Sequence, residues 1–226
     1  MAEHSLGGTP PVSVTLRRSG RARRISLRIS QLDGRVTLTL PHGVRDAEGL
    51  DFARSKQDWI RETLNRRPQE TGIGYGSVLP IEGAPHRVVP APGRRIVARP
   101  GEIAVPEGAV ARRLQTWLRE LARDRLVAAS DRYAQALGRP YSRITLRDTR
   151  SRWGSCTSQG ALMYSWRLVL APPEILHYVA AHEVAHLAEM NHSAAFWATV
   201  ERIHGPYGAL RAWLRSEGNA LHRFRF

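Results

Sequence analysis

The stretch His182-Glu183-Val184-Ala185-His186, followed closely by Asn191-His192, decides how this chain is interpreted. An α-helix repeats every 3.6 residues or so, so His182 and His186 would project from one face, a turn apart. Two imidazoles at that spacing can hold one metal ion. Glu183 would lie about 100° around the helix from His182, where it could reach a metal-bound water without binding the metal. This is the zincin arrangement, in which the glutamate is the general base of a metal-activated water.

The residues before and within this motif favour a helix. Pro172, Pro173 and Glu174 are typical of a helix start, with proline in the first turn and an acid near the positive end of the helix dipole. An apolar stripe beside the histidines would consist of Ile175, Leu176, Val179, Ala180, Leu187 and Met190. The alternative is an ordinary helix, whose histidines are solvated or packed in the core and whose glutamate is exposed.

The third metal ligand is predicted to come from beyond the helix. A catalytic zinc ion takes three protein ligands and keeps one position for water. His192 follows His186 by six residues, so the helix must end or bend for its side chain to return to the metal. Asn191 tolerates the left-handed conformation that often ends a helix and could make this turn. Glu201, from a following helix, is the alternative third ligand. We therefore expect one Zn²⁺ per chain.

The chain has 226 residues and is strongly basic, with a formal net charge of +14. Lys56 is the only lysine, so nearly all of this charge is arginine. A GC-rich genome would explain the preference for arginine over lysine, but not the shortage of acidic residues. The arginines in residues 17–24 form either a solvated loop or a phosphate contact. Because clustered basic charge attracts phosphate backbones, a weak and non-specific nucleic-acid contact is a further expectation.

Three features that the sequence lacks predict the cellular location: a second cysteine, a signal peptide and a transmembrane run. Cys156 is the only cysteine, so no intrachain disulfide can form, which suits a reducing compartment. Residues 1–11 lack the apolar stretch of a signal peptide. No run of about 18 apolar residues could form a transmembrane helix. We therefore expect a cytoplasmic protein that makes no membrane contact.

Three regions are expected along the chain. Residues 1–11 are polar and rich in glycine and proline, which predicts a disordered tail. Residues 12–105 contain many short alternating apolar runs, which predict a β-rich N-terminal region. Residues 106–226 contain the histidine motif and are predicted to form the zincin-like metallopeptidase domain.

Within these regions the periodicity predicts particular elements. Residues 12–40 favour an antiparallel meander, with Asp33-Gly34 as a hairpin turn. Residues 45–66 favour one helix, and residues 109–137 favour a long helix that Gly138 ends.

Two alternating runs, residues 144–146 and 162–168, precede the metal helix and predict a hairpin-like unit. The predicted fold is therefore α+β, with the metal-binding helix next to an antiparallel sheet. If residues 162–168 form an edge strand, an extended peptide could pair with it. The alternative is an ordinary core strand.

Two further stretches stand out, Thr149-Arg150-Ser151-Arg152-Trp153-Gly154-Ser155-Cys156 and Trp166-Arg167-Leu168-Val169-Leu170-Ala171-Pro172-Pro173. Together with the segment from His182-Glu183 to Phe196-Trp197, they resemble the YgjP-like metallopeptidase family, which is related to the SprT and WLM zinc metallopeptidases. Residues 24–28 and 34–36 also look like its N-terminal region, so the resemblance covers nearly the whole chain.

This resemblance implies a zincin-like α+β fold that acts on a peptide or protein substrate. It places zinc ligands at His182, His186 and His192 and makes Glu183 catalytic, but it does not identify a physiological substrate.

Other side chains are candidates for supporting roles. A second donor to the oxyanion is usually useful in such reactions, and Tyr207, Arg152 and Tyr164 are the candidates. Cys156 is either an inhibitory thiolate near the zinc or, as is more common for a lone cysteine, a small buried hydrophobe.

The function predicted from the sequence is that of a zinc-dependent metallopeptidase, which hydrolyses peptide bonds with Glu183 as general base. Two alternatives stand beside it. One is a basic, polyanion-associated protein with a structural zinc site, and the other is a protease that acts on nucleic-acid-bound proteins. A fully ligated metal would favour the first alternative, whereas three ligands and a water favour an enzyme. The sequence does not predict an oligomeric state.

Overall fold

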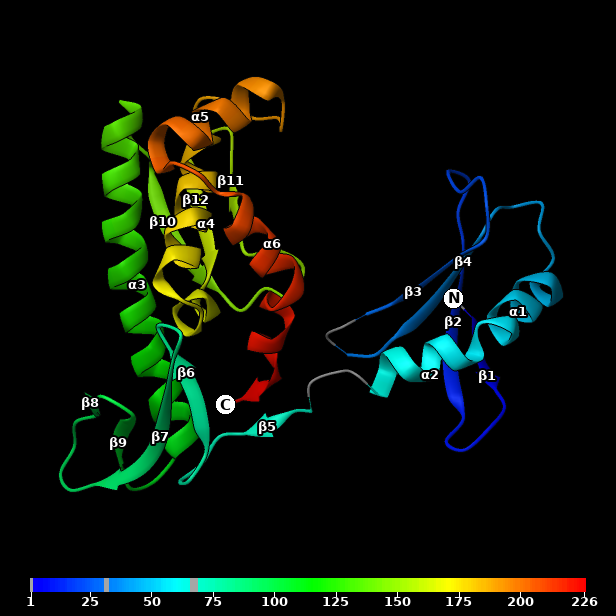
Figure 1. Cartoon of the computed structure of the whole chain (residues 1–226), viewed down its shortest axis with the longest axis horizontal. Coiled ribbons are helices and arrows are strands. Elements are labelled where there is room, and N and C mark those ends of the chain that lie inside the picture. The colour runs from blue at the N-terminus through cyan, green and yellow to red at the C-terminus, as the bar shows by residue number, and fades with distance from the viewer. Residues whose placement is uncertain (1, 31–32, 66–68) are drawn as a thin grey trace. The chain divides into compact units, whose positions relative to one another are not determined.

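Among the residues that the structure describes, two separate apolar cores form. The computed structural model describes residues 2–30, 33–65 and 69–226. The chain divides into the units Met1–Gln69 and Glu70–Phe226, and each unit buries its own set of aliphatic side chains. Both units combine helices with sheets (Figure 1), so the predicted α+β class is confirmed at that level.

The N-terminal unit is a four-stranded sheet with two helices. Its elements are β1 (Ala2–Leu6), β2 (Val12–Arg18), β3 (Ser26–Ile29), β4 (Val36–Leu40), α1 (Asp46–Ser55) and α2 (Gln57–Asn65). Alternate residues of β2 and β4 are buried, and they share a core with residues of both helices. The strand order is β1-β2-β4-β3.

This unit differs from the sequence prediction in three places. Ala2–Leu6 is a strand paired antiparallel with β2, where a disordered tail was expected for residues 1–11. β2 and β4 pair in parallel, so residues 12–40 are not a meander, although β3 and β4 form the expected antiparallel pair. The helix expected over residues 45–66 is two helices that meet at Lys56. Residues 1, 31, 32 and 66 of these expectations lie outside the described residues.

The C-terminal unit begins with a second four-stranded sheet and a long helix. Its first elements are β5 (Thr71–Gly72), β6 (Val78–Ile81), β7 (Ala84–Ala91), β8 (Val97–Arg99), β9 (Glu102–Pro106) and α3 (Val110–Leu137). The strand order is β6-β7-β9-β8. α3 ends at Gly138 in a left-handed conformation, as predicted.

The strands of residues 78–106 belong with the region that carries the histidine motif and not with residues 12–69. Leu79, Val88 and Ile103 are fully buried in the core that α3 also lines. The turn between β6 and β7 lies close to the start of the metal helix, because a Cβ on Gly83 would lie 2.9 Å from the Cα of Pro172. The boundary expected between residues 105 and 106 is therefore found after Gln69.

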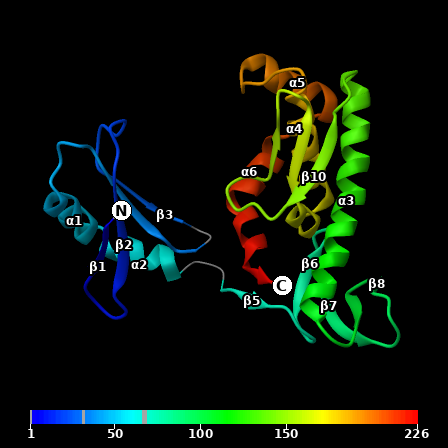
Figure 2. The same cartoon turned by 180° about the vertical axis from the view of Figure 1, so that it is seen from behind.

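The remaining elements surround the histidine motif. They are β10 (Arg143–Arg147), β11 (Gly154–Cys156), β12 (Ala161–Ser165), the 3-10 helix η1 (Trp166–Leu170), α4 (Pro173–Ala185), α5 (Ala194–His204), α6 (Gly208–Ser216), η2 (Gly218–Arg223) and β13 (Phe224–Arg225). In both views α4 lies alongside α3 and the strands of this sheet (Figures 1 and 2).

The sheet beside the metal helix is mixed, whereas an antiparallel sheet was expected. β12 pairs in parallel with β10 and antiparallel with β11. Residues 162–168 are not one strand, because the chain turns into η1 at Trp166. β12 is also the central strand, so both of its edges are occupied, and β11 is the edge strand on this side.

The buried side chain of Arg167 ties the C-terminal segment to this layer. Its Nε and Nη2 atoms donate to the two carboxylate oxygens of Asp148, at 2.6 and 3.1 Å. Its Nη1 atom donates to the carbonyl oxygens of Leu221 and Phe224, at 3.0 Å each. The guanidinium also lies 4.8 Å from the ring centroid of Trp166. A single arginine therefore joins η1, the residues after β10 and the end of the chain.

Replacing Arg167 with Met should lower the free energy of unfolding by roughly 3 kcal/mol, because it leaves Asp148 and two carbonyl groups without their donor. Urea denaturation would measure this change. Arg125→Met is the matched control, since it removes an exposed ion pair with Glu82 in the same unit, and should cost about 1 kcal/mol or less. Equal losses in the two variants would contradict the anchoring role.

Candidate metal centre

Helix α4 carries the first part of the histidine motif. It starts at Pro173, directly after Pro172, as the sequence predicted. Most of its side chains are buried, including Ile175, Val179 and Val184. The last helical residue is Ala185, and His186 caps the helix with helical backbone angles. The helical spacing of the motif is therefore kept through its second histidine.

The three predicted ligands lie together. One ring nitrogen from each of His182, His186 and His192 falls within 4.8 Å of the others, and the group could hold a metal ion. The Nε2 atoms of His182 and His192 are 3.1 Å apart. Tetrahedral zinc with Zn–N bonds of about 2.0–2.1 Å needs nitrogens roughly 3.4 Å apart. The donor set thus fits a metal ion that prefers imidazole ligands, such as zinc.

The surroundings orient His186 and favour the neutral forms of His182 and His186. The Nδ1 atom of His186 lies 2.9 Å from the carbonyl oxygen of Glu189, so a proton on Nδ1 leaves Nε2 free for a metal. Burial and the neighbouring His186 and His192 lower the pKa of His182 to about 3. Burial also lowers the pKa of His186. Neutral imidazole is the form that binds metals.

The chain returns to the metal site through a short turn. The Oδ1 atom of Asn191 accepts a hydrogen bond from the Ser193 backbone at 3.1 Å. Asn191 does not adopt the left-handed conformation expected for it, because this Asx-type turn makes the reversal instead. Ser193 then caps α5, and its Oγ atom accepts the backbone N–H of Phe196 at 3.4 Å.

Phe196 supports all three histidine rings. It is fully buried in the first turn of α5. Its ring stacks on His186 with a centroid separation of 4.4 Å, and it meets His182 and His192 edge-on at 4.9 and 4.8 Å. The imidazoles are therefore backed by a rigid apolar surface that limits their rotation.

Glu183 is 6% exposed and faces the edge strand β11. Burial raises the pKa of its carboxyl group to about 8, although the charge of Arg152 acts in the opposite direction. A carboxyl group whose pKa lies near neutrality is suited to exchanging a proton with water.

The other candidates fall in different places. Glu201 is exposed on α5 and is not part of the metal-binding group found among the described residues. Burial, with a smaller contribution from Glu183, raises the pKa of the Cys156 thiol to about 11. This thiol donates to the carbonyl oxygen of Thr157 at 3.3 Å. Cys156 is half-buried and is not part of the metal-binding group found among the described residues.

The three candidates for the oxyanion donor differ in accessibility. Tyr164 is fully buried, and its hydroxyl group lies 3.0 Å from that of Ser130. Tyr207 is stacked between Tyr178 and Trp197, with centroid separations of 5.9 and 5.2 Å. Arg152 is exposed, yet close enough to affect the pKa of Glu183. Of the three, Arg152 is therefore the most exposed.

Comparison with known proteins identifies the family. A family model described as YgjP-like, metallopeptidase domain, matches residues 23–217. The chain belongs to the YgjP-like family. It is therefore a metallopeptidase, and the resemblance noted in the sequence is confirmed.

One solved structure is also similar to this YgjP-like metallopeptidase. It is the metallopeptidase zymogen of Pyrococcus abyssi abylysin, with 20% sequence identity and a TM-score of 0.37, over 41% of this chain and 92% of that one. None of the curated proteins compared with the chain matches it.

Two parts of the site were not anticipated from the sequence. Phe196 was recognisable only as an apolar residue of the following helix, and its contact with all three histidines depends on the turn at Asn191. The carbonyl oxygen of Glu189 orients His186, and a backbone group leaves no signal in side-chain identity.

In this YgjP-like metallopeptidase, Phe196→Leu should weaken metal binding by about 10-fold, because the support of the ligand rings is lost. Competition with a chromogenic chelator would measure the affinity. Val200→Ala is the control, since Val200 is also fully buried on α5 but outside the histidine cluster. Equal metal affinities in the two variants would argue against the supporting role.

Proposed function

We propose that this metallopeptidase is zinc-dependent and hydrolyses peptide bonds at the cluster of His182, His186 and His192, with Glu183 as general base. Two observations carry the proposal: three imidazole nitrogens converge, and a buried carboxyl group, that of Glu183, directly follows one of their residues on the same helix. Three protein ligands leave one position of a tetrahedral metal for water, which favours a catalytic over a structural site. The proposed fold type is zincin-like.

The chemistry requires one proton to pass through Glu183. A bound zinc ion would supply Lewis-acid chemistry, which activates a water molecule and polarises the substrate carbonyl. Glu183 accepts a proton from the attacking water and later delivers it to the amine as the peptide C–N bond breaks. The exposed guanidinium of Arg152 is the proposed second donor to the oxyanion.

The proposed substrate is an extended peptide or protein segment. β11 is an edge strand beside Glu183, so an incoming strand could use its free backbone groups. This moves the proposed pairing from residues 162–168 to Gly154–Cys156. A hollow of about 440 Å³ also opens next to His186, lined in part by Thr157, Gln159 and Met190. It could receive a substrate side chain.

The proposed location is the cytoplasm, which a single cysteine suits. In the part of the chain that the structure describes, no helix combines the length and apolar character needed to cross a bilayer.

We expect about one zinc ion per chain, and we expect the double variant His182→Ala/His186→Ala to lose it, because one imidazole cannot hold the metal. Elemental analysis of the purified protein would measure this. His192→Ala should also reduce the zinc content, whereas Glu201→Ala should not. Zinc retained in the double variant would contradict the site, and the reverse pattern at residues 192 and 201 would move the third ligand to Glu201.

Glu183→Gln should keep the zinc content and the fold but lose peptide hydrolysis by at least about 100-fold. The amide has nearly the same size as the carboxylate but cannot accept the proton. Zinc analysis, thermal unfolding and cleavage of unfolded protein substrates would separate these effects. Hydrolysis at the wild-type rate would end the general-base proposal.

A specific surface favours a second, auxiliary function in polyanion contact. A groove of about 350 Å³ lies on the sheet of the N-terminal unit, and all of its lining residues are polar: Arg17, Arg28, Ser30, Asp33, Arg35, Thr37 and Thr39. Arg17 is paired in register with Thr39, and Arg28 with Thr37. Guanidinium and hydroxyl groups are common phosphate ligands. With no aromatic side chain in the groove, base stacking is not expected.

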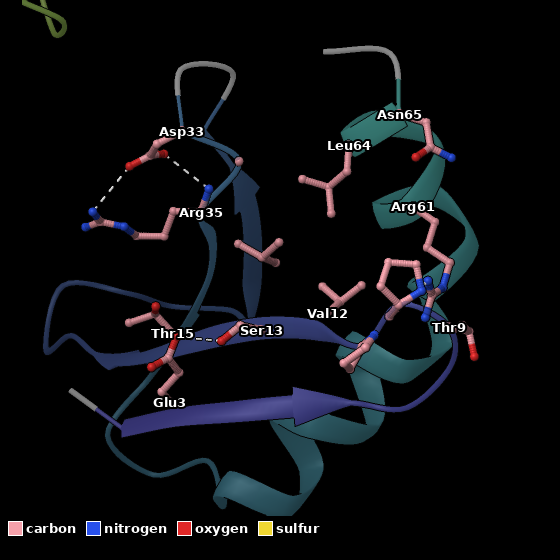
Figure 3. A pocket seen from close by; sticks show the side chains of 14 residues that line it. Glu3, Thr9, Val12, Ser13, Thr15, Asp33, Arg35, Arg61, Leu64 and Asn65 are labelled. Atoms are coloured by element: carbon pink, nitrogen blue, oxygen red, sulfur yellow. Dashed lines mark hydrogen bonds and ion pairs between the residues drawn. The ribbon is translucent and has the colours of Figure 1, made fainter. Parts of the chain in front are cut away.

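Not every charge in this groove is free. Asp33 forms an ion pair with Arg35 at 3.2 Å, as the dashed line in Figure 3 marks. The same figure shows a neighbouring pocket, where the Ser13 hydroxyl donates to Glu3 at 2.6 Å. The groove therefore keeps a positive excess, because Arg17, Arg28 and Arg35 outnumber Asp33. In the neighbouring pocket Glu3 and Asp33 balance Arg35 and Arg61.

We expect weak binding of a single-stranded oligonucleotide that falls with salt and does not depend on sequence. The triple variant Arg17→Ala/Arg28→Ala/Arg35→Ala should weaken it by about 10-fold or more. Arg94→Ala/Arg95→Ala/Arg99→Ala removes the same charge from exposed positions elsewhere and is the control. Fluorescence anisotropy would measure both. Equal affinities in the two triple variants, or sequence-specific binding that persists at moderate salt, would overturn this prediction.

A further inference from the structure

The carboxylate of Glu183 occupies the space that a side chain at residue 154 would need. A Cβ atom built on Gly154 would lie 2.5 Å from Cγ of Glu183, 2.6 Å from Oε1 and 2.8 Å from Cδ. Non-bonded carbon and oxygen atoms do not approach this closely, since contacts between carbon atoms are favourable at about 3.5–4.0 Å. Every one of these near atoms belongs to the proposed base.

The backbone of Gly154 does not itself require glycine. It is absent from the glycines with positive φ, so an alanine could adopt the same conformation without backbone strain. The usual reasons for a glycine in a strand are a bulge or a close approach of another group. Here the group that approaches is the side chain of Glu183.

Contacts other than the one with Glu183 hold β11, the strand that carries Gly154, in place. Gly154 pairs with Tyr164 on the central strand β12, and the Ser165 backbone donates to the Trp153 carbonyl oxygen at 2.8 Å. The Trp153 ring stacks near His222 with a centroid separation of 5.1 Å and lies within 3.1 Å of the Cβ position of Gly218. A clash at residue 154 would therefore be relieved by Glu183, whose carboxylate is the movable end of a side chain.

We propose that Gly154 is a positioning residue for the hydrolytic reaction: its missing side chain creates the space that directs the Glu183 carboxylate. This inference rests on the proposed role of Glu183 as general base. Gly154 donates no group to the reaction, but it lets the edge strand and the base lie in direct contact. β11, the strand proposed to bind the substrate, would then also fix the position of the Glu183 carboxylate, which is the proposed proton acceptor.

Gly154→Ala should keep the zinc content and lower kcat by about 100-fold, because a displacement of a reacting group by about 1 Å can cost that much. KM should change far less than kcat. The assay uses an internally quenched peptide that the wild-type protein cleaves. Gly208→Ala is the matched control, because a Cβ at Gly208 would meet nothing within 4 Å, and it should leave kcat unchanged. A wild-type kcat in Gly154→Ala would overturn the proposal.

A stability cycle tests the same contact without any activity. In the wild-type background, Gly154→Ala should lower the melting temperature, because it crowds Cγ, Cδ and Oε1 of Glu183. In a Glu183→Ala background these atoms are gone, so the same substitution should have little effect. Equal losses in the two backgrounds would overturn the proposal, as would failure of both double and single variants to fold. If Glu183→Gln keeps full hydrolysis, the base assignment fails instead, and the stability cycle still reports on the contact.

Discussion

Helix α4 is buried on most of its surface, yet it has to present two imidazoles and a carboxyl group. The packing of the surrounding elements depends on this constraint. Burying polar groups is costly unless each finds a partner. His186 finds one in the Glu189 carbonyl group, and His182 and His192 lie together. Glu183 has none of these partners and is shifted towards its neutral form by burial. Under the proposed function, a bound metal and its water would satisfy the polar groups of His182, Glu183 and His186 that the protein itself does not.

The elements around α4 each contribute one side of the site. α3 and β12 contribute apolar side chains to the core around α4. α5 places Phe196 against the histidines, and β11 lies in direct contact with Glu183. Arg167 holds the end of the chain against the same layer through four hydrogen bonds to Asp148, Leu221 and Phe224. Because these contacts join distant parts of the sequence, the site depends on the whole C-terminal unit.

The N-terminal unit follows a different physical pattern. Its core is built from β-branched and leucine side chains on one face of a small sheet, while the other face exposes arginines and threonines. The family match begins at residue 23, so most of this unit belongs to the same family domain as the histidine cluster. The chain has two cores because each unit packs on itself. The division after Gln69 does not coincide with a boundary of the matched family domain.

Local spacing in the sequence was enough to predict helix α4, the helical phase of His182, Glu183 and His186, and the ending of α3 at Gly138, because each depends on neighbouring residues. The return of His192 was predicted only as a requirement of the metal, and the structure achieves it by an Asx turn instead of a left-handed Asn191. Strand pairing was less predictable. The parallel β2–β4 pair, the central position of β12 and the division after Gln69 depend on contacts between residues far apart in the chain. The fit of Glu183 against Gly154 also emerged only from the tertiary structure, because the space left by a missing side chain has meaning only once another part of the chain fills it.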